Sequence, residues 1–143
     1  MLDERWLPRE EGRVLLTVSV ISVVDDDASV RAATSKFLRS HGYEVQAYSS
    51  AEEFLGSGRL NDPSCVIADV QMRGMSGLEL LTTTRAQGHG VPFIFITAFP
   101  DERIRARALQ AGAICFLPKP FAGPTLINCV VVALDGHRRE EDT

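Results

Sequence analysis

Short apolar runs alternate along this chain with longer segments in which apolar residues recur at helical spacing. The runs at residues 18–24, 65–69 and 93–97 are almost continuously apolar, which is typical of strands covered on both faces of a parallel sheet. Residues 43–48 instead alternate apolar and more polar positions, which indicates a strand at an edge of the sheet, with one solvated face. Strands that alternate with helices in this way predict an α/β fold with a parallel sheet.

The same pattern predicts five strands and five helices in alternation. Strands are expected at residues 18–24, 43–48, 65–69, 93–97 and 114–117, and helices at residues 28–40, 51–55, 78–87, 102–111 and 123–134. Asp27 directly precedes the first helix and is its expected N-cap. Because parallel strands connect through right-handed crossovers, few arrangements of five strands remain. The simplest is a doubly wound sheet with helices on both faces.

Polar segments border the predicted domain. Residues 1–13 have no apolar periodicity and contain Pro8 and Gly12, so we expect a flexible N-terminal arm there. The folded domain is expected at residues 14–135, and residues 136–143 are expected to form a charged C-terminal tail.

The last predicted helix carries more apolar surface than one buried face needs. One stripe is expected to face the core, and a second follows i, i+4, i+7 spacing. The first consists of Leu126, Cys129, Val130 and Ala133, and the second of Ile127, Val131 and Leu134. We expect the second stripe to be a docking surface, for a homodimer or for a protein partner, unless a neighbouring segment such as the N-terminal arm covers it.

Composition narrows the classes of function. The 143 residues are 45% hydrophobic, with a net charge of -4 and a pI near 5.3, so direct nucleic-acid binding, which usually needs a basic face, is not expected. The apolar run at residues 14–24 is far shorter than the roughly 20 residues that cross a bilayer, so we expect no membrane span. Cys65, Cys115 and Cys129 lack CxxC spacing and lie in apolar runs, which favours reduced, buried thiols and a cytoplasmic location.

Polar side chains gather at the ends of the predicted strands. Asp25 and Asp26 follow the first strand, Asp69 ends the third, Thr97 ends the fourth, and Lys119 follows the fifth. The functional crevice of an open parallel sheet lies at this edge. Clustered carboxylates repel one another unless a cation is present, and Mg²⁺ prefers carboxylate oxygens. A lysine and a hydroxyl beside them suit the oxygens of a transferring phosphoryl group.

The segments that carry these residues read VVDDDASVR, VIADVQMRGMSGLEL, ITA and FLPKPF. In order and spacing they resemble the marker segments of response-regulator receiver domains, notably those of the nitrogen-fixation and LuxR-type regulators. The resemblance covers about residues 18–134 and implies a flavodoxin-like strand order of 2-1-3-4-5. It also implies a phosphoacceptor of a two-component phosphorelay, a binding module rather than a metabolic enzyme, which catalyses only its own phosphorylation and dephosphorylation.

The resemblance implies a role for each residue of the predicted site. Asp69 matches the phosphoacceptor, which takes its phosphoryl group from a histidine kinase or a phosphotransfer protein and thereby switches binding to a downstream protein target. Thr97 and Lys119 match the two phosphate contacts. Phe116 matches the aromatic residue that turns inward when Thr97 moves toward the phosphate.

The resemblance also implies the ligands of Mg²⁺. Asp26 is expected to contact the metal directly and Asp25 largely through water, while Asp69 and the backbone carbonyl of Gln71 complete the protein ligands. The bond from Lys119 to the following proline matches one that is cis in this family, consistent with the low cost of cis before proline.

Two residues depart from the family pattern. Arg73 stands where relatives commonly have proline, which makes the loop after Asp69 more basic and less rigid. Phe99 is bulky and apolar beside the predicted pocket, where its ring is expected to exclude water and prolong the phosphorylated state, unless it packs on the fourth helix.

Two other classes of protein share part of this chemistry. A haloacid-dehalogenase-like Mg²⁺ phosphohydrolase also uses an aspartate nucleophile, but on its first strand and in a DxD motif, whereas Asp69 ends the third predicted strand. A flavodoxin-like FMN protein needs a Ser/Thr/Gly-rich phosphate loop after its first strand. Here that position holds consecutive aspartates, so the receiver domain remains the favoured interpretation.

Overall fold

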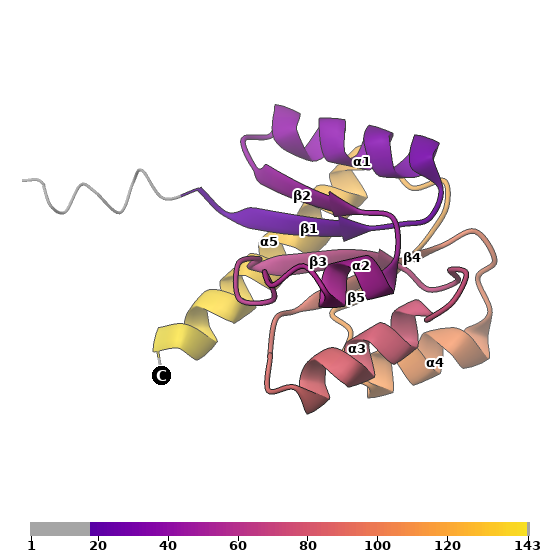
Figure 1. Cartoon of the computed structure of the whole chain (residues 1–143). Coiled ribbons are helices and arrows are strands. Elements are labelled where there is room, and N and C mark those ends of the chain that lie inside the picture. The colour runs from indigo at the N-terminus through magenta and orange to yellow at the C-terminus, as the bar shows by residue number, and fades with distance from the viewer. Residues whose placement is uncertain (1–17, 143) are drawn as a thin grey trace, which may run out of the picture.

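The computed structural model describes residues 18–142, with side chains described for residues 18–136, and in it strands and helices alternate in chain order (Figure 1). The strands are β1 (Val20–Val24), β2 (Glu44–Tyr48), β3 (Cys65–Asp69), β4 (Phe93–Thr97) and β5 (Cys115–Pro118). The helices are α1 (Ala28–Ser40), α2 (Ala51–Leu55), α3 (Gly77–Ala86), α4 (Glu102–Gln110) and α5 (Gly123–Asp142). The predicted N-terminal arm at residues 1–13 lies outside the described residues.

The five strands form one parallel sheet in the order β2-β1-β3-β4-β5, which confirms the predicted fold class and strand order. The edge position predicted for residues 43–48 is also confirmed, since β2 pairs with β1 alone among the described strands. Because all strands are parallel, their carboxyl ends lie at one edge of the sheet, on the right in Figure 1.

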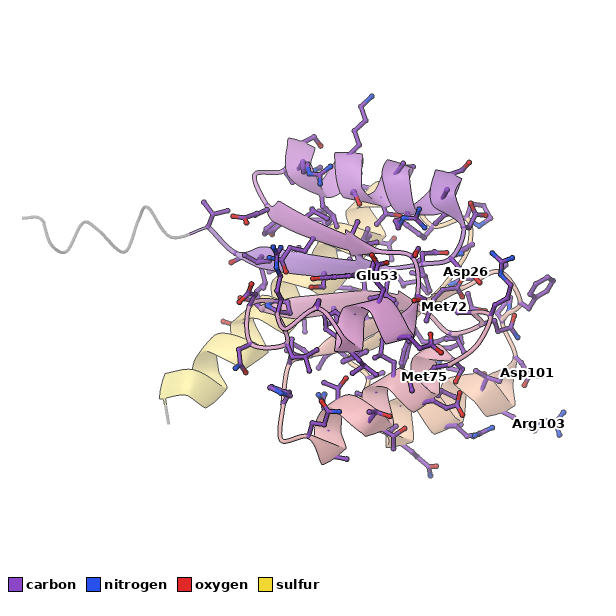
Figure 2. All side chains as sticks on the ribbon, viewed as in Figure 1. Asp26, Glu53, Met72, Met75, Asp101 and Arg103 are labelled. Carbon is purple, nitrogen blue, oxygen red and sulfur yellow. The ribbon has the colours of Figure 1, made fainter. Side chains whose placement is uncertain are left out.

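Helices cover both faces of the sheet, and successive strand residues pack on opposite faces. Ala68 of β3 packs in the cluster that includes α2, α3 and α4, whereas its neighbour Ile67 packs in the cluster that includes α1 and α5. The helices contribute Phe54, Leu80, Leu81 and Ala108 to the first cluster and Leu38, Leu126, Cys129 and Val130 to the second. Side chains fill the space on each side of the sheet (Figure 2). This double burial explains why the central strands read as continuous apolar runs.

Polar caps determine where the helices next to the site begin. As predicted, Asp27 caps α1: its Oδ1 accepts hydrogen bonds from the backbone N–H groups of Ser29 (2.9 Å) and Val30 (3.2 Å). Ser76 and Glu79 form a reciprocal capping box on α3, each side chain accepting from the other's backbone N–H. The box makes α3 begin at residue 77, one residue earlier than predicted.

The predicted end of the last helix is wrong. It was expected at residue 134, with a charged tail from 136, but α5 continues to Asp142. The segment after residue 134 is polar, yet arginine and glutamate are good helix formers, and a single glycine costs a helix only about 1 kcal/mol. A polar sequence here therefore does not mark the end of the helix.

The two predicted stripes of α5 differ in part from their expected burial. Leu126, Cys129, Val130 and Ala133 are buried, which confirms the inward stripe. In the second stripe, however, Leu134 is also buried, and Ile127 is half-buried against the same core. Val131 is exposed, together with its neighbour Val132. The exposed apolar surface of α5 is therefore smaller than predicted.

The three cysteines carry free thiols. Cys65 and Cys129 are buried as predicted, and Cys115 is half-buried. Burial raises the pKa of the Cys65 and Cys115 thiols, the latter to about 12, so both stay protonated at neutral pH. Among the described residues, no helix is long and apolar enough to span a membrane.

Candidate functional site

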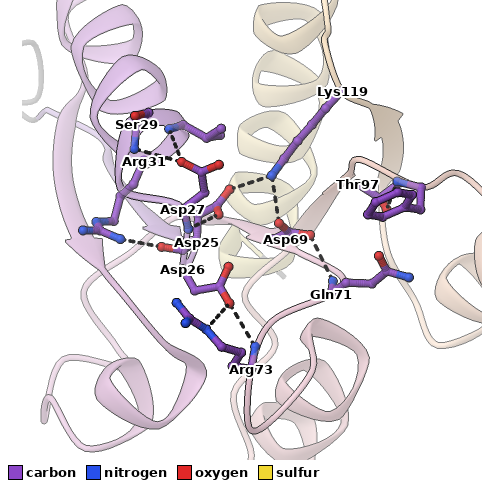
Figure 3. A network of polar contacts seen from close by, with 12 residues as sticks. Asp25, Asp26, Asp27, Ser29, Arg31, Asp69, Gln71, Arg73, Thr97 and Lys119 are labelled. Atoms are coloured by element: carbon purple, nitrogen blue, oxygen red, sulfur yellow. Dashed lines mark hydrogen bonds and ion pairs between the residues drawn. The ribbon is translucent and has the colours of Figure 1, made fainter.

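The sheet brings four of the predicted site residues to one edge. Asp25 directly follows β1, Asp69 and Thr97 are the last residues of β3 and β4, and Lys119 directly follows β5. These four strands are neighbours in the sheet, so residues separated by up to 94 positions meet there (Figure 3). In Figure 2 the labelled Asp26 lies at the same edge, beside the loop after β3 that carries Met72.

Asp25 is completely buried at the bottom of the site. Its Oδ1 accepts a hydrogen bond from the backbone N–H of Asp27 at 2.9 Å, and its Oδ2 lies 3.2 Å from Nζ of Lys119. Among the described residues, Oδ2 of Asp25 accepts no hydrogen bond, and Lys119 is its ion-pair partner. Burial raises the pKa of the Asp25 carboxyl, although the Asp27 N–H and the Lys119 ammonium act in the opposite direction.

Asp69 is nearly buried and is held by both of its carboxylate oxygens. Oδ1 accepts a hydrogen bond from the backbone N–H of Gln71 at 3.0 Å, and Oδ2 accepts one from Nζ of Lys119 at 2.8 Å. Burial lowers the pKa of Lys119, but hydrogen bonds and charge from Asp69 and Asp25 outweigh this effect and raise the pKa above its ordinary value. Lys119 is therefore a cation that bridges the two buried carboxylates.

Asp25, Asp26 and Asp69 form a group that could hold a metal ion, because one carboxylate oxygen from each lies within 4.8 Å of the others. Oxygen ligands from carboxylates are those that Mg²⁺ prefers. The buried Oδ2 of Asp25, which accepts no hydrogen bond from a described residue, adds unused acceptor capacity. These residues fit the predicted metal. The fourth predicted ligand, the carbonyl of Gln71, belongs to the residue whose N–H holds Asp69.

Thr97 lies at the same edge and is buried at the end of β4. Its Oγ1 accepts a hydrogen bond from the backbone N–H of Phe99 at 3.1 Å. A hydroxyl can accept and donate at once, so Thr97 keeps a proton for an incoming oxygen. Phe116 is half-buried and packs against the core cluster on the face of α2, α3 and α4. The predicted coupling of Phe116 to Thr97 stays a prediction.

The structure adds contacts that sequence reasoning missed. The backbone N–H of Arg73 donates to Oδ2 of Asp26 at 2.9 Å, and its Nε lies 3.5 Å from the same oxygen. Nη1 of Arg31 donates to the backbone carbonyl of Asp25 at 2.7 Å. The departure from proline at position 73 was the available signal for the first contact. The position of Arg31 in the predicted first helix is ordinary, so no feature of the sequence indicated its contact with the carbonyl of Asp25.

Two further predictions concern local geometry beside the site. The peptide bond between Lys119 and Pro120 is cis, as the resemblance implied. Phe99 is exposed, with 69% of its surface accessible. Its predicted role as a water shield stays a prediction.

Comparison with known proteins gives a family match for the sequence. Residues 21–131 match the response regulator receiver domain. The chain is 37% identical over 126 residues to nodulation protein W of Bradyrhizobium diazoefficiens, covering 88% of this chain and 56% of the relative. It is 38% identical over 114 residues to the transcriptional regulatory protein FixJ of Azorhizobium caulinodans, covering 80% and 54%. The chain thus spans about half the length of the curated relatives it matches.

Solved structures give the same result. The response regulator StyR superposes with a TM-score of 0.82 at 39% identity, covering 88% of this chain and 64% of StyR. The crystal structure titled FixJ-N superposes with a TM-score of 0.76 at 30% identity, covering 84% of this chain and 96% of that one.

Proposed function

Because this chain belongs to the family of response-regulator receiver domains, and so to two-component signalling, we propose that Asp69 is its phosphoacceptor. The observation that carries the assignment is the position of the Asp69 carboxylate. One oxygen lies 2.8 Å from Nζ of Lys119, and the group lies within reach of two further carboxylates at the carboxyl edge of the sheet. The haloacid-dehalogenase-like alternative has no support in the family match.

The proposed donor is a phosphohistidine of a histidine kinase or of a phosphotransfer protein. A carboxylate oxygen of Asp69 forms a bond to phosphorus while the bond from phosphorus to the histidine nitrogen breaks, and the electron pair stays on the imidazole. Lys119 is already in contact with Asp69 and would neutralise charge on a phosphoryl oxygen. Thr97 would donate its hydroxyl proton to another, while its oxygen still accepts from Phe99.

Asp25, Asp26, Asp69 and the carbonyl of Gln71 would hold Mg²⁺. When bound, the ion supplies positive charge to the oxygens of the transferring group. Lys119 would orient the acceptor by its bridge between Asp25 and Asp69. The chain thereby catalyses its own phosphorylation and dephosphorylation and is otherwise a binding module rather than an enzyme.

Phosphorylation would be passed to a downstream protein target through Thr97 and Phe116. Movement of Thr97 toward the phosphoryl group would leave space that the half-buried ring of Phe116 can enter. Val131 and Val132 of α5, which are 52% and 58% exposed, support a homodimer or partner surface on that helix. The free thiols of the three cysteines fit a reducing compartment, so we place the chain in the cytoplasm.

The assignment is tested with purified protein, Mg²⁺ and a small acyl-phosphate donor. Intact mass should show one phosphoryl group that is stable in acid and labile in base. Asp69→Asn should abolish it, while Asp62→Asn, which changes an aspartate exposed in the α2–β3 loop, should leave it unchanged. Modification of Asp69→Asn at the wild-type rate would show that the acceptor is another residue.

The metal assignment is tested in the same assay. Asp26→Ala should mainly weaken Mg²⁺ binding, so the phosphorylation rate should recover in part when the metal concentration is raised. A rate that is low at every Mg²⁺ concentration would contradict a role for Asp26 as a metal ligand.

A further inference from the structure

Arg73 forms a hydrogen bond and an ion pair with Asp26, one of the carboxylates that would hold the metal. Arg73 contacts a single oxygen of Asp26 twice, through its backbone N–H at 2.9 Å and through Nε at 3.5 Å. Figure 3 shows both contacts on the oxygen of Asp26 that faces the loop after β3. The pair joins residues 47 positions apart, and it links the loop after β1 to the loop after β3. A cation of the protein itself thus lies against a proposed ligand of Mg²⁺.

The two partners differ strongly in exposure. The Arg73 side chain is 89% exposed, whereas that of Asp26 is 24% exposed. Because the guanidinium is mostly in water, it can leave Asp26 without losing buried contacts. A cleft of about 650 Å³, lined among others by Arg73, Gln71, Glu79 and Arg107, lies beside it and leaves room for this movement. An ion pair with one exposed partner is weak, so it adjusts a binding site rather than closing it.

The balance of charge gives the direction of the effect. Lys119 lies within ion-pair distance of Asp25 and Asp69, and among the residues whose side chains are described Arg73 is the cation that contacts Asp26. With both cations counted, the three ionised carboxylates carry a net charge of −1, and without Arg73 they would carry −2. A divalent cation is attracted more strongly to the second arrangement.

We propose that Arg73 competes with Mg²⁺ for Asp26 and so lowers the affinity of this receiver for the metal, an inference that rests on the proposed metal site. Arg73 acts through Asp26 and is therefore a positioning residue. The competition has a regulatory consequence, because phosphorylation requires a higher Mg²⁺ concentration than it would with a neutral residue at position 73. This requirement depends on the salt concentration, since salt screens the charge of Arg73.

The test measures Mg²⁺ binding to the full chain by isothermal titration calorimetry, without a phosphodonor. Arg73→Gln should bind Mg²⁺ about two- to tenfold more tightly than wild type, and Arg73→Lys should stay close to wild type. Arg59→Gln is the matched control, because the substitution removes the same charge. Arg59 is exposed in the loop before β3, at the other end of the sheet from the site. The gain of Arg73→Gln should shrink when NaCl is raised.

A second readout follows Arg73 itself. In an NMR titration the Nε–Hε resonance of Arg73 should move with Mg²⁺ occupancy, because the ion pair with Asp26 is lost. An unmoved resonance, or an equal affinity in Arg73→Gln and Arg59→Gln, would overturn the role of Arg73 while leaving the metal site intact. Absence of any Mg²⁺ binding in the wild type would instead overturn the proposed metal site itself.

Discussion

Gly77 allows helix α3 to begin directly against β3, the strand that ends in the proposed phosphoacceptor Asp69, and Gly77→Ala should therefore be costly. An alanine Cβ at this position would overlap the backbone carbonyl oxygen of Asp69 and would lie 3.0 Å from both Cε1 of Phe95 and Cα of Val70. The Gly77 N–H also donates to the carbonyl of Val70 at 2.9 Å. Two of the three crowded atoms are backbone atoms, so a side-chain rotation cannot relieve the overlap.

The magnitude follows from two opposing effects. Forcing an extra methyl group into a packed position typically costs about 1–3 kcal/mol. Replacement of glycine in a helix returns at most about 1 kcal/mol, and less at the first helical position than in the interior. We expect Gly77→Ala to lower the free energy of unfolding by about 1–2 kcal/mol. With a urea m-value of roughly 1.5 kcal/mol/M, the unfolding midpoint should fall by about 1 M.

The assay is urea unfolding followed by circular dichroism, with Gly136→Ala as the control. Gly136 lies inside α5, and apart from the backbone of its own helix a Cβ there would meet no described atom within 4 Å. The same substitution should raise the midpoint by about 0.3–0.6 M, because it only removes the conformational freedom of glycine. Gly77→Ala should also slow phosphorylation of Asp69 by at least about tenfold, since displacement of a reacting group by less than 1 Å is sufficient.

The reasoning would be refuted by a midpoint of Gly77→Ala equal to or above that of wild type. Such a result would mean that the start of α3 moves away from Asp69 at little cost. A lower midpoint with an unchanged phosphorylation rate would separate the two effects and remove Gly77 from the positioning of Asp69.

Three other results are expected. Burial raises the pKa of Asp25 above the ordinary value of 3.8, so the folded state binds this proton more tightly than the unfolded state, and stability is lost as pH rises through the raised pKa. Asp25→Asn should therefore raise the urea midpoint at pH 7 without Mg²⁺, with a smaller gain near pH 4, and an equal gain at both pH values would contradict this. The acyl phosphate should persist for minutes in wild type and decay faster in Phe99→Ala and Phe99→Glu, because the exposed ring of Phe99 would fold over the pocket and exclude water. Equal decay in all three proteins would remove the shielding role. Val131→Lys should abolish any phosphorylation-dependent dimer seen by sedimentation, and association that persists would place the interface elsewhere.

The sequence alone determined the architecture and most of the site. Strands buried on both faces need apolar residues at every position, so the runs at residues 65–69 and 93–97 identified a parallel sheet before any contact was known. A parallel sheet places all carboxyl strand ends at one edge, so Asp69 and Lys119 could be brought together from 50 positions apart. Their proposed roles came from the family resemblance, which the spacing of the motifs made specific.

The tertiary structure decided the features that depend on which atoms meet. Leu134 is buried although it lies on the second predicted stripe of α5, because the core around that helix is wider than one stripe. The ion pair of Arg73 with Asp26 joins two loops 47 positions apart, and no local pattern fixes the distance between such loops. The same is true of Gly77, whose missing side chain matters only because the carbonyl of Asp69 lies against it. Periodicity determines which face of an element is buried, but contacts between loops depend on the geometry of the folded sheet that carries them.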